Sequence, residues 1–468
     1  MALRRFLDQL RHDLGRIRTK DSFSHNAFAV FSGNTVSLAS QLLLTPLIAR
    51  IYGPEAYGVY GLFTALVMNF SAFTDLGYSN AYVLPKEDGR FMHLLRLNFS
   101  LLGAVLFIAL LMAFFSDLLY SVLPGWGMLG GFIWFVPFSI FTYSTAIFFT
   151  QWFTRLRAFK TSVYIGSSAT VGVRVFNFTY GLVRKGSTQG LIIGDVVVGG
   201  IATVVYWTAM AKHGAGRIFR EWSWRGIREM AVEYKRYPLL TFPERWVSLI
   251  GMQLPVFLLI EDPVIVGQFA LSGALLLIPL RLLGYSFSTV YVQKAAETVD
   301  ADPALLGRIT KGLYQRLFLI GLLPFTGLIF FSDEVFRIVL GEAWRDAGVI
   351  TAYMGLFFYF RMMSEPMVAL FYVKRREHTL LVFQSILVIA RVGVMLPLVH
   401  AGCSAGTAIL GFAMVSGAGY LVLGALLLHA AQQRAIFLTI RTVVITTIAC
   451  SVFAGLRFLV LGTWWPAL

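Results

Sequence analysis

Five arginine residues lie inside long apolar stretches of this chain, where ionised side chains are rare. They are Arg174, Arg245, Arg281, Arg361 and Arg391, and four of them belong to the second half of the sequence. An ionised side chain at the centre of a bilayer costs about 2.5–3.5 kcal/mol on insertion scales, so it normally faces protein or water. The planar guanidinium group also fits the oxygens of a phosphate better than an ammonium does. These arginines are therefore candidate ligand-binding residues.

Four carboxylates in the same stretches could perform a second kind of chemistry. They are Asp75, Asp195, Glu244 and Glu365. A buried carboxylate can take up a proton on one side of a membrane and release it on the other. We therefore treat these four as candidates for coupling to a proton or sodium gradient.

Ordinary ion pairing is the alternative for both groups. Arg361 and Glu365 are four residues apart and would lie on one face of a helix. Arg174 could pair with Asp195 on the next predicted helix. The sequence alone leaves both interpretations open.

Other kinds of chemistry have no support in the sequence. The histidines lack a metal-ligand spacing, and no glycine-rich phosphate loop follows a predicted strand. The two cysteines, Cys403 and Cys450, are too few for a metal-ligand set. We therefore predict no catalytic residue, no metal site and no cofactor.

The elements that position these residues are membrane-spanning helices. Of the 468 residues, 57% are hydrophobic and only 13% are charged, whereas an average soluble domain has about 25% charged residues. A spanning helix needs about 20 apolar residues, and twelve such segments occur in two groups of six. The first group is 27–50, 57–84, 92–115, 127–152, 161–183 and 189–211, and the second is 238–260, 266–292, 312–333, 347–373, 379–401 and 405–430. The sequence predicts an all-α polytopic membrane protein, with 438–461 as a thirteenth helix or a re-entrant or interfacial piece.

The distribution of basic residues predicts the orientation. With the N-terminus inside, 28 of the 39 Lys and Arg residues fall on the cytoplasmic side and five on the outer side, as the positive-inside rule requires. The net charge of +15 is scattered between apolar runs, which excludes a nucleic-acid partner. Residues 1–26 are predicted to form a basic amphipathic N-terminus, and 212–237 a basic, tryptophan-containing cytoplasmic linker.

An internal repeat supports the division into two halves. Pro46, Pro54 and Gly58 recur 209 residues later as Pro255, Pro263 and Gly267. Six crossings per half preserve the orientation, so we predict two six-helix lobes related by a pseudo-twofold axis along the membrane normal. The predicted N-lobe is 27–211, the C-lobe is 238–430, and 431–468 is a C-terminal segment that contains the thirteenth helix.

Three stretches carry a family resemblance. They are "LLLTPLIARIYGPEAYGVYGLFTAL" (42–66) with "FTDLGYSNAYV" (73–83), "YKRYPLLTFPERWVSLIGMQLPVFLLIEDPVIVGQFAL" (234–271) and "SDEVFRIVLGEAWRDAG" (332–348). Over 27–430 the chain resembles the polysaccharide-biosynthesis flippases, the Wzx-type lipid-linked oligosaccharide flippases of the MOP exporter superfamily. Asp75 lies in a motif of this family, which favours a structural role for it.

The resemblance implies a function and partners. It implies two lobes around a cavity and transport by alternating access. The implied cargo is a polyprenyl-pyrophosphate-linked oligosaccharide, which moves from the cytoplasmic to the periplasmic leaflet of a bacterial inner membrane. The implied pathway is surface polysaccharide synthesis. The cargo and membrane lipids are the expected partners of a monomer, which could associate with polymerase and export components. A cation-coupled small-molecule antiporter of the same superfamily is the alternative. A membrane polysaccharide polymerase or ligase is disfavoured because the outer loops are short.

Overall fold

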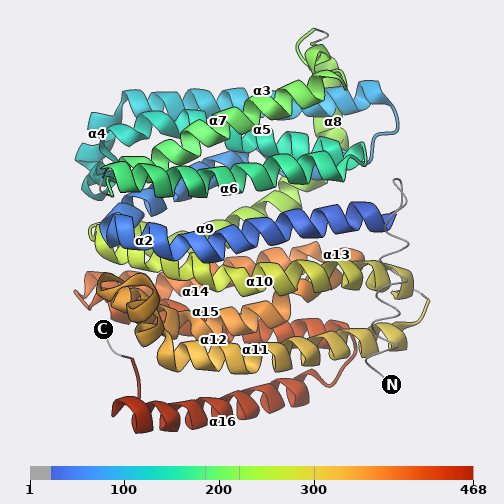
Figure 1. The fold of residues 1–468 in the computed structure, drawn as a ribbon. Coiled ribbons are helices and arrows are strands. Elements are labelled where there is room, and N and C mark those ends of the chain that lie inside the picture. Colours follow the sequence, from blue (N-terminus) through green and yellow to red (C-terminus); the bar gives the residue numbers. More distant parts are fainter. Residues whose placement is uncertain (1–22, 185, 221, 300, 467–468) are drawn as a thin grey trace. The chain divides into compact units, whose positions relative to one another are not determined.

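The computed structural model describes residues 23–466 except 185, 221 and 300, and this part of the chain contains helices and no strand (Figure 1). It divides into two compact units. The first contains Phe70–Phe115 and Phe132–Lys235 together with the chain up to Ile51, and the second contains Tyr52–Asn69, Ser116–Gly131 and the chain from Arg236 onward. The short segments 52–69 and 116–131, which the predicted N-lobe includes, thus group with the second unit. The predicted lobe boundaries and their symmetry stay predictions.

The helices of the first unit run along one another (Figure 1). They are the first part of α2 (Phe23–Asp75), η1 (Tyr78–Ala81), α3 (Asp88–Phe114), α5 (Val136–Arg155), α6 (Phe159–Arg184), α7 (Gln189–Ala211), η3 (Ala215–Arg217) and α8 (Trp224–Glu233). Gly53 interrupts α2 with a φ of 72°, a left-handed conformation that glycine adopts readily. Residues 1–22 of the predicted amphipathic segment 1–26 lie outside the described part of the chain.

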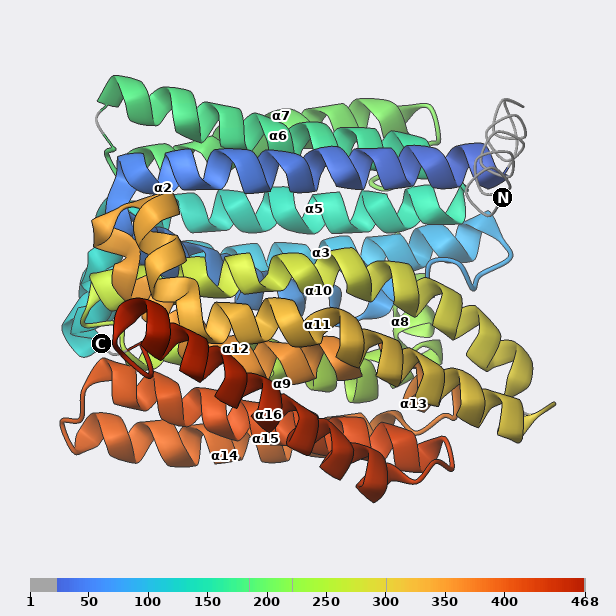
Figure 2. The same ribbon diagram turned by 60° about the horizontal axis from the view of Figure 1, so that its bottom comes forward.

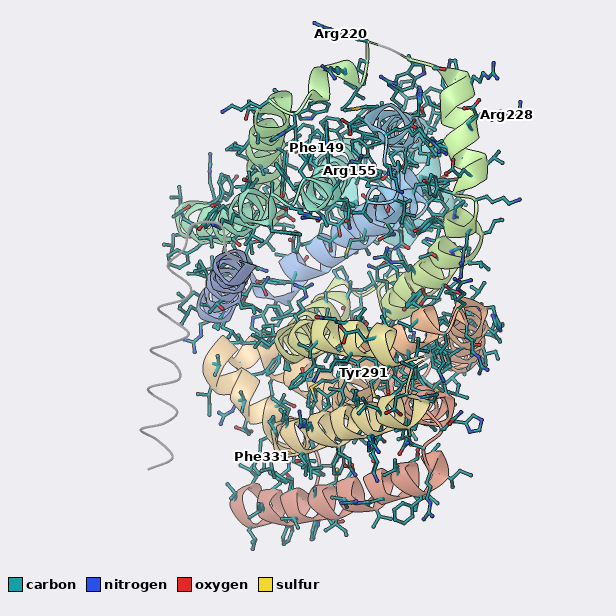
Figure 3. The ribbon with its side chains drawn as sticks, turned by 90° about the vertical axis from the view of Figure 1, so that its right-hand side faces the viewer. Phe149, Arg155, Arg220, Arg228, Tyr291 and Phe331 are labelled. Carbon is teal, nitrogen blue, oxygen red and sulfur yellow. The ribbon has the colours of Figure 1, made fainter. Side chains whose placement is uncertain are left out.

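The predicted linker 212–237 contains the amphipathic helix α8. Ser223 caps its start by accepting a hydrogen bond from Gly226 N, and Ile227 and Met230 are buried on its inner face, which packs against α3. On the opposite side Arg228 points outward, as does Arg220 in the preceding loop (Figure 3). The basic side chains of the linker are therefore displayed at the surface of the first unit.

The second unit contains the remaining helices. They are α4 (Ser116–Val122), most of η2 (Pro124–Phe135), η4 (Tyr237–Thr241), α9 (Phe242–Leu258), α10 (Pro263–Thr298), α11 (Pro303–Leu340), η5 (Glu342–Trp344), α12 (Arg345–Ser364), η6 (Glu365–Met367), α13 (Ala369–Val373), α14 (Glu377–His400), α15 (Ala405–Ala430) and α16 (Ala435–Leu461). Proline at the first position and an aspartate cap define the starts of α10 and α11: Asp262 accepts from Val264 N and Ile265 N, and Asp302 accepts from Leu305 N.

Ten helices of the described chain are long and apolar enough to cross a membrane. All thirteen predicted segments are helical, and the difference of three has simple causes. The two segments before and after Gly53 count as one helix, α9 has only 17 residues, and α6 contains Arg174 and Asn177. The chain is therefore a multi-pass membrane protein, and its predicted all-α class is confirmed.

The repeated proline and glycine positions meet within the second unit. A Cβ atom added to Gly58 would overlap the carbonyl oxygen of Pro263, and one added to Gly267 would overlap the carbonyl oxygen of Pro54. The contact is reciprocal, because each glycine lies against the proline of the other copy of the motif. The sequence repeat therefore marks a close helix crossing, for which glycine is needed at both positions.

The thirteenth predicted segment is the continuous 27-residue helix α16. It lies beside α11 along one edge of the second unit (Figures 1 and 2). Arg457 on α16 and Asp333 on α11 form a buried ion pair through two hydrogen bonds of 2.7 Å. The pair satisfies an arginine that would otherwise face lipid.

Candidate functional site

The second unit encloses a cavity of about 570 Å³. Its wall is formed by the second part of α2 and by α9, α10, α12, α13, α14 and α15. Most of the lining is apolar, including Leu249, Val256 and Phe269. Charged side chains on such a wall are costly unless they serve a ligand or one another.

Four of the predicted site residues line this cavity: Glu244, Arg245, Arg361 and Glu365. Glu244 and Arg245 lie in the first turn of α9. Arg361 lies in the last turn of α12, and Glu365 begins the following turn. Segments more than 100 positions apart in sequence thus bring two carboxylates and two guanidinium groups to one wall.

Arg361 and Glu365 form the ion pair that their spacing predicts. Arg361 Nε donates to Glu365 Oε2 at 2.8 Å, and Nη2 donates to Oε1 at 3.0 Å. The guanidinium group also lies over the rings of Phe358 and Tyr420, at 5.9 and 5.7 Å from their centroids. This parallel, two-bond geometry fixes the orientation of Arg361. Its charge is therefore largely balanced.

Arg281 faces an adjoining cavity of about 270 Å³. The two cavities share Leu277, Arg361 and Glu365 as lining residues, so Arg281 belongs to the same polar region. Within the described part of the chain, neither Arg281 nor Arg245 takes part in an ion pair. Their charges are available to a ligand.

Arg391 is fully buried within α14, beside the cavity wall. Its Nε donates to Ser416 Oγ at 2.8 Å, and its guanidinium carbon lies 5.5 and 5.0 Å from the ring centroids of Phe357 and Phe412. Nη1 is buried without a hydrogen-bond acceptor among the described residues. A buried cation with an unused donor is unfavourable in the unliganded protein, which makes Arg391 a candidate for a ligand or for a positioning role.

Met252 connects Arg391 with the cavity. Its sulfur lies 3.4 Å from Arg361 Nη1 and 3.9 Å from Arg391 Nη2, and the residue itself lines the cavity. Gly251 leaves room for the guanidinium group, since a Cβ atom there would lie 3.0 Å from Arg391 Nη1. The flexible thioether is thus the lining residue next to both arginines.

Glu244 occupies a different environment from Glu365. It is buried, with 8% of its surface exposed, and it accepts a hydrogen bond of 3.1 Å from the Tyr372 hydroxyl. A carboxylate held by a neutral hydroxyl, near one cation, can exchange a proton or bind a cation with little rearrangement. Glu244 is therefore the coupling candidate that the geometry favours.

The remaining predicted residues lie in the first unit. Asp75 accepts hydrogen bonds from Ser79 N at 2.7 Å, Ser79 Oγ at 2.8 Å and Asn98 Nδ2 at 3.1 Å, so it stabilises the turn that follows α2. Arg174 and Asp195 are half-buried on the adjacent helices α6 and α7.

The sequence analysis did not predict the uncharged polar residues that line the cavity. Tyr372, Gln253 and Gln384 line it, and the side-chain oxygen of Gln384 is buried without a hydrogen-bond partner. Gln253 also accepts a hydrogen bond from Asn69. Amide side chains inside apolar spans were the available signal, because they too must find partners in a membrane.

Comparisons with known proteins identify the family and the fold. A family model described as "Polysaccharide biosynthesis protein" matches residues 47–349. No curated protein matches the chain. Among solved structures, the lipid II flippase MurJ in an inward closed conformation is similar, with a TM-score of 0.63, 14% identity and coverage of 92% of this chain and 98% of that one.

Two further solved structures belong to the MOP superfamily. An inward-facing multidrug resistance MATE transporter has a TM-score of 0.62 and 13% identity, over 86% of this chain and 99% of that one. A transporter from Pyrococcus furiosus, described by a binding pocket of reverse polarity that suggests a different function, has a TM-score of 0.56 and 13% identity, over 88% and 95%. The chain therefore belongs to the polysaccharide biosynthesis protein family and has the fold of the MOP superfamily.

Proposed function

We propose that this protein is a flippase for a lipid-linked oligosaccharide. It moves a polyprenyl-pyrophosphate-linked sugar from the cytoplasmic to the periplasmic leaflet of a bacterial inner membrane by alternating access, for the synthesis of a surface polysaccharide such as O-antigen or exopolysaccharide. The single observation that carries the proposal is the cationic region of the second unit. There Arg245 and Arg281 make no ion pair within the described chain, and both border cavities that also contain Arg361.

The chemistry of the cargo explains why such a region is useful. A pyrophosphate carries at least two negative charges, and its transfer into an apolar medium without partners costs tens of kcal/mol. Arginine groups that face a wet cavity replace part of the water around the phosphate oxygens, and each can donate two parallel hydrogen bonds. The polyprenyl chain needs no such help because it is as apolar as the lipid around it.

The predicted orientation places the cationic region toward the side where the cargo is made. Arg245 lies about two turns after the predicted inner linker, and Arg361 and Glu365 precede the predicted inner loop 374–378. Reporter fusions at 86–90 and 374–378 are expected to be cytoplasmic, and those at 184–188 and 341–345 external. An exchange between the two sets would reject this orientation.

Glu244 is the proposed coupling residue, with Glu365 as the second candidate. Glu244 is buried beside the neutral Tyr372 hydroxyl, whereas the charge of Glu365 is balanced by Arg361. Uptake of a proton or sodium ion at Glu244 would raise the positive charge of the cavity, and its release would lower it. We expect the protein to act as a monomer that needs no further cofactor, with polymerase and export components as possible associates.

The second candidate function is cation-coupled export of a small organic molecule. The observation that favours it is the pair of carboxylates on the cavity wall, Glu244 and Glu365. The unpaired guanidinium groups argue against a cationic cargo, because like charges repel across a cavity of low dielectric constant. The two functions therefore predict cargoes of opposite charge.

Reconstituted protein distinguishes the two functions. Liposomes that contain the protein and a fluorescent polyprenyl-pyrophosphate-linked oligosaccharide are expected to expose the sugar to an added lectin, and the rate should respond to an imposed proton or sodium gradient. Efflux of an organic cation dye without any movement of the lipid-linked sugar would reject the flippase in favour of the antiporter. Complementation of a flippase-null strain, scored by the glycan that returns, would then identify the sugar.

A further inference from the structure

A narrow crevice separates α11 from α16 near the start of the last helix. Its volume is about 200 Å³, and it is distinct from the cavities described above in all of its lining residues. Its walls consist of Tyr314, Gln315, Phe318 and Leu319 on α11 and Leu438, Arg441, Thr442 and Ile445 on α16. Seven of these eight side chains are neutral, and four are apolar. Among the described residues that line the crevice, Arg441 is the only cation.

The crevice is part of a helix interface that is closed on both sides. Toward the start of α16, Gly307 lies directly against the backbone of Ala431. Toward its end, Arg457 and Asp333 form their buried ion pair. A hydrogen bond of 3.0 Å between the hydroxyl groups of Tyr314 and Thr442 joins the two helices at the crevice itself. These ties fix the width of the opening, so it is not a gap left by a loosely attached helix.

Arg441 has the properties of a headgroup ligand. Its side chain is exposed at the second turn of α16, and no hydrogen bond or ion pair involves it in the described chain. The adjacent wall offers the Gln315 amide as a further donor and then becomes apolar at Phe318, Leu319 and Ile445. One charged donor followed by an apolar channel matches a molecule with an anionic head and a hydrocarbon tail.

We propose that this crevice is a binding site for one anionic phospholipid. The phosphate pairs with Arg441 and accepts a hydrogen bond from Gln315, while an acyl chain packs along Phe318, Leu319 and Ile445. In the predicted orientation Arg441 lies at the cytoplasmic end of α16, on the side where positive residues meet anionic lipids. The site concerns the bilayer lipid and not the cargo, so it stands independently of the proposed transport function.

The test uses the full-length protein in a mild detergent. Phosphatidylglycerol is titrated against the midpoint of thermal unfolding, with phosphatidylcholine as the zwitterionic comparison, and native mass spectrometry counts the retained lipids. We expect the wild type to be stabilised by phosphatidylglycerol more than by phosphatidylcholine and to retain one molecule of it. Arg441→Gln should weaken this binding about tenfold, which corresponds to the loss of one charge-assisted contact.

Two further variants separate the crevice from general surface charge. Ile445→Trp should fill the apolar channel and abolish retention of the lipid while preserving Arg441. Arg316→Gln removes an exposed arginine from the neighbouring α11 that does not line the crevice, so it should bind like the wild type. Unchanged selectivity in Arg441→Gln, or an equal loss in Arg316→Gln, would overturn the proposal.

Discussion

Arg96 in the first unit and Arg391 in the second are both buried arginines, but their surroundings differ. Arg96 donates through Nε to the carbonyl of Ile218 and through Nη2 to that of Arg217, both at 2.8 Å, and its Nη1 lies 3.3 Å from His93 Nδ1. Arg391 donates to Ser416 and leaves Nη1 without an acceptor among the described residues. Burial alone therefore does not distinguish a structural arginine from a candidate ligand-binding arginine. The number of hydrogen-bond acceptors around the guanidinium group does distinguish them.

The same contrast extends to other charged groups of the two units. In the first unit Arg155 donates to the carbonyl oxygens of Tyr82 and Pro85 and pairs with Asp88. In the second unit Arg245 and Arg281 border cavities, and neither has such a partner among the residues that the structure describes. Arg96 and Arg155 of the first unit therefore stabilise loops, whereas Arg245 and Arg281 of the second remain available for a ligand.

The largest expected effect comes from Arg96→Ala. Two buried carbonyl groups would lose hydrogen bonds from a charged donor, each contributing about 1.5–3 kcal/mol, so the free energy of unfolding should fall by about 4 kcal/mol. Denaturant titration in mixed micelles measures this change. Arg90→Ala on the same helix is the control, because its ion pair with Glu233 is exposed and contributes little. Equal stability of the two variants would contradict a structural role for Arg96.

Charge reversal at Arg245 or Arg281 should affect transport and not folding. Each variant is expected to reduce the rate of flipping in liposomes about 100-fold, or about 2.7 kcal/mol, because a cation that attracts phosphate becomes an anion that repels it. Lys294→Glu provides a matched control, since Lys294 is an exposed cation on α10 that does not line either cavity. Wild-type rates in both cavity variants would show that these arginines do not serve the cargo.

Arg391→Gln is expected to have an intermediate effect. A neutral side chain relieves the buried charge, so the unfolding temperature should not fall, in contrast to Arg96→Ala. Flipping should slow about tenfold, because about 1.4 kcal/mol of charge-assisted interaction is lost. The exposed Arg376→Gln at the start of the same helix is the control. A lower unfolding temperature with unchanged flipping would assign Arg391 to packing.

The smallest effect is expected for Arg225→Ala on α8. Arg225 and Glu229 form an exposed pair at 3.2 Å, with 91% and 60% of their side chains accessible. Such pairs contribute less than about 0.5 kcal/mol. Neither the unfolding free energy nor the flipping rate should change measurably, and a clear loss of either would mean that α8 has a partner beyond the first unit.

Much of the fold follows from the sequence because membrane helices are encoded locally. Every predicted span is helical, since an apolar run of about 20 residues satisfies its backbone hydrogen bonds internally. The repeated Pro and Gly positions were interpreted only as evidence for two halves, and the structure adds that Gly58 and Gly267 lie at a reciprocal helix crossing. Spacing likewise predicted the pair of Arg361 with Glu365.

The sequence did not predict which side chains on different helices contact each other. Nothing in the order of residues indicates that Arg457 meets Asp333, or that Arg391 lies beside Met252. These contacts depend on the rotation of each helix about its axis, which apolar spans specify weakly because lipid and protein both accept leucine and valine. The clustering of Arg245, Arg281 and Arg361 was a hypothesis until helix packing was known.

The pair of Arg457 and Asp333 has a consequence for how the chain is assembled during synthesis. Asp333 precedes Arg457 by 124 residues, so the acceptor enters the membrane well before its cation leaves the ribosome. Until the two meet, the last helix exposes a charge that the translocon tolerates poorly. The last helix is therefore expected to insert with an uncompensated charge in a chain that lacks Asp333.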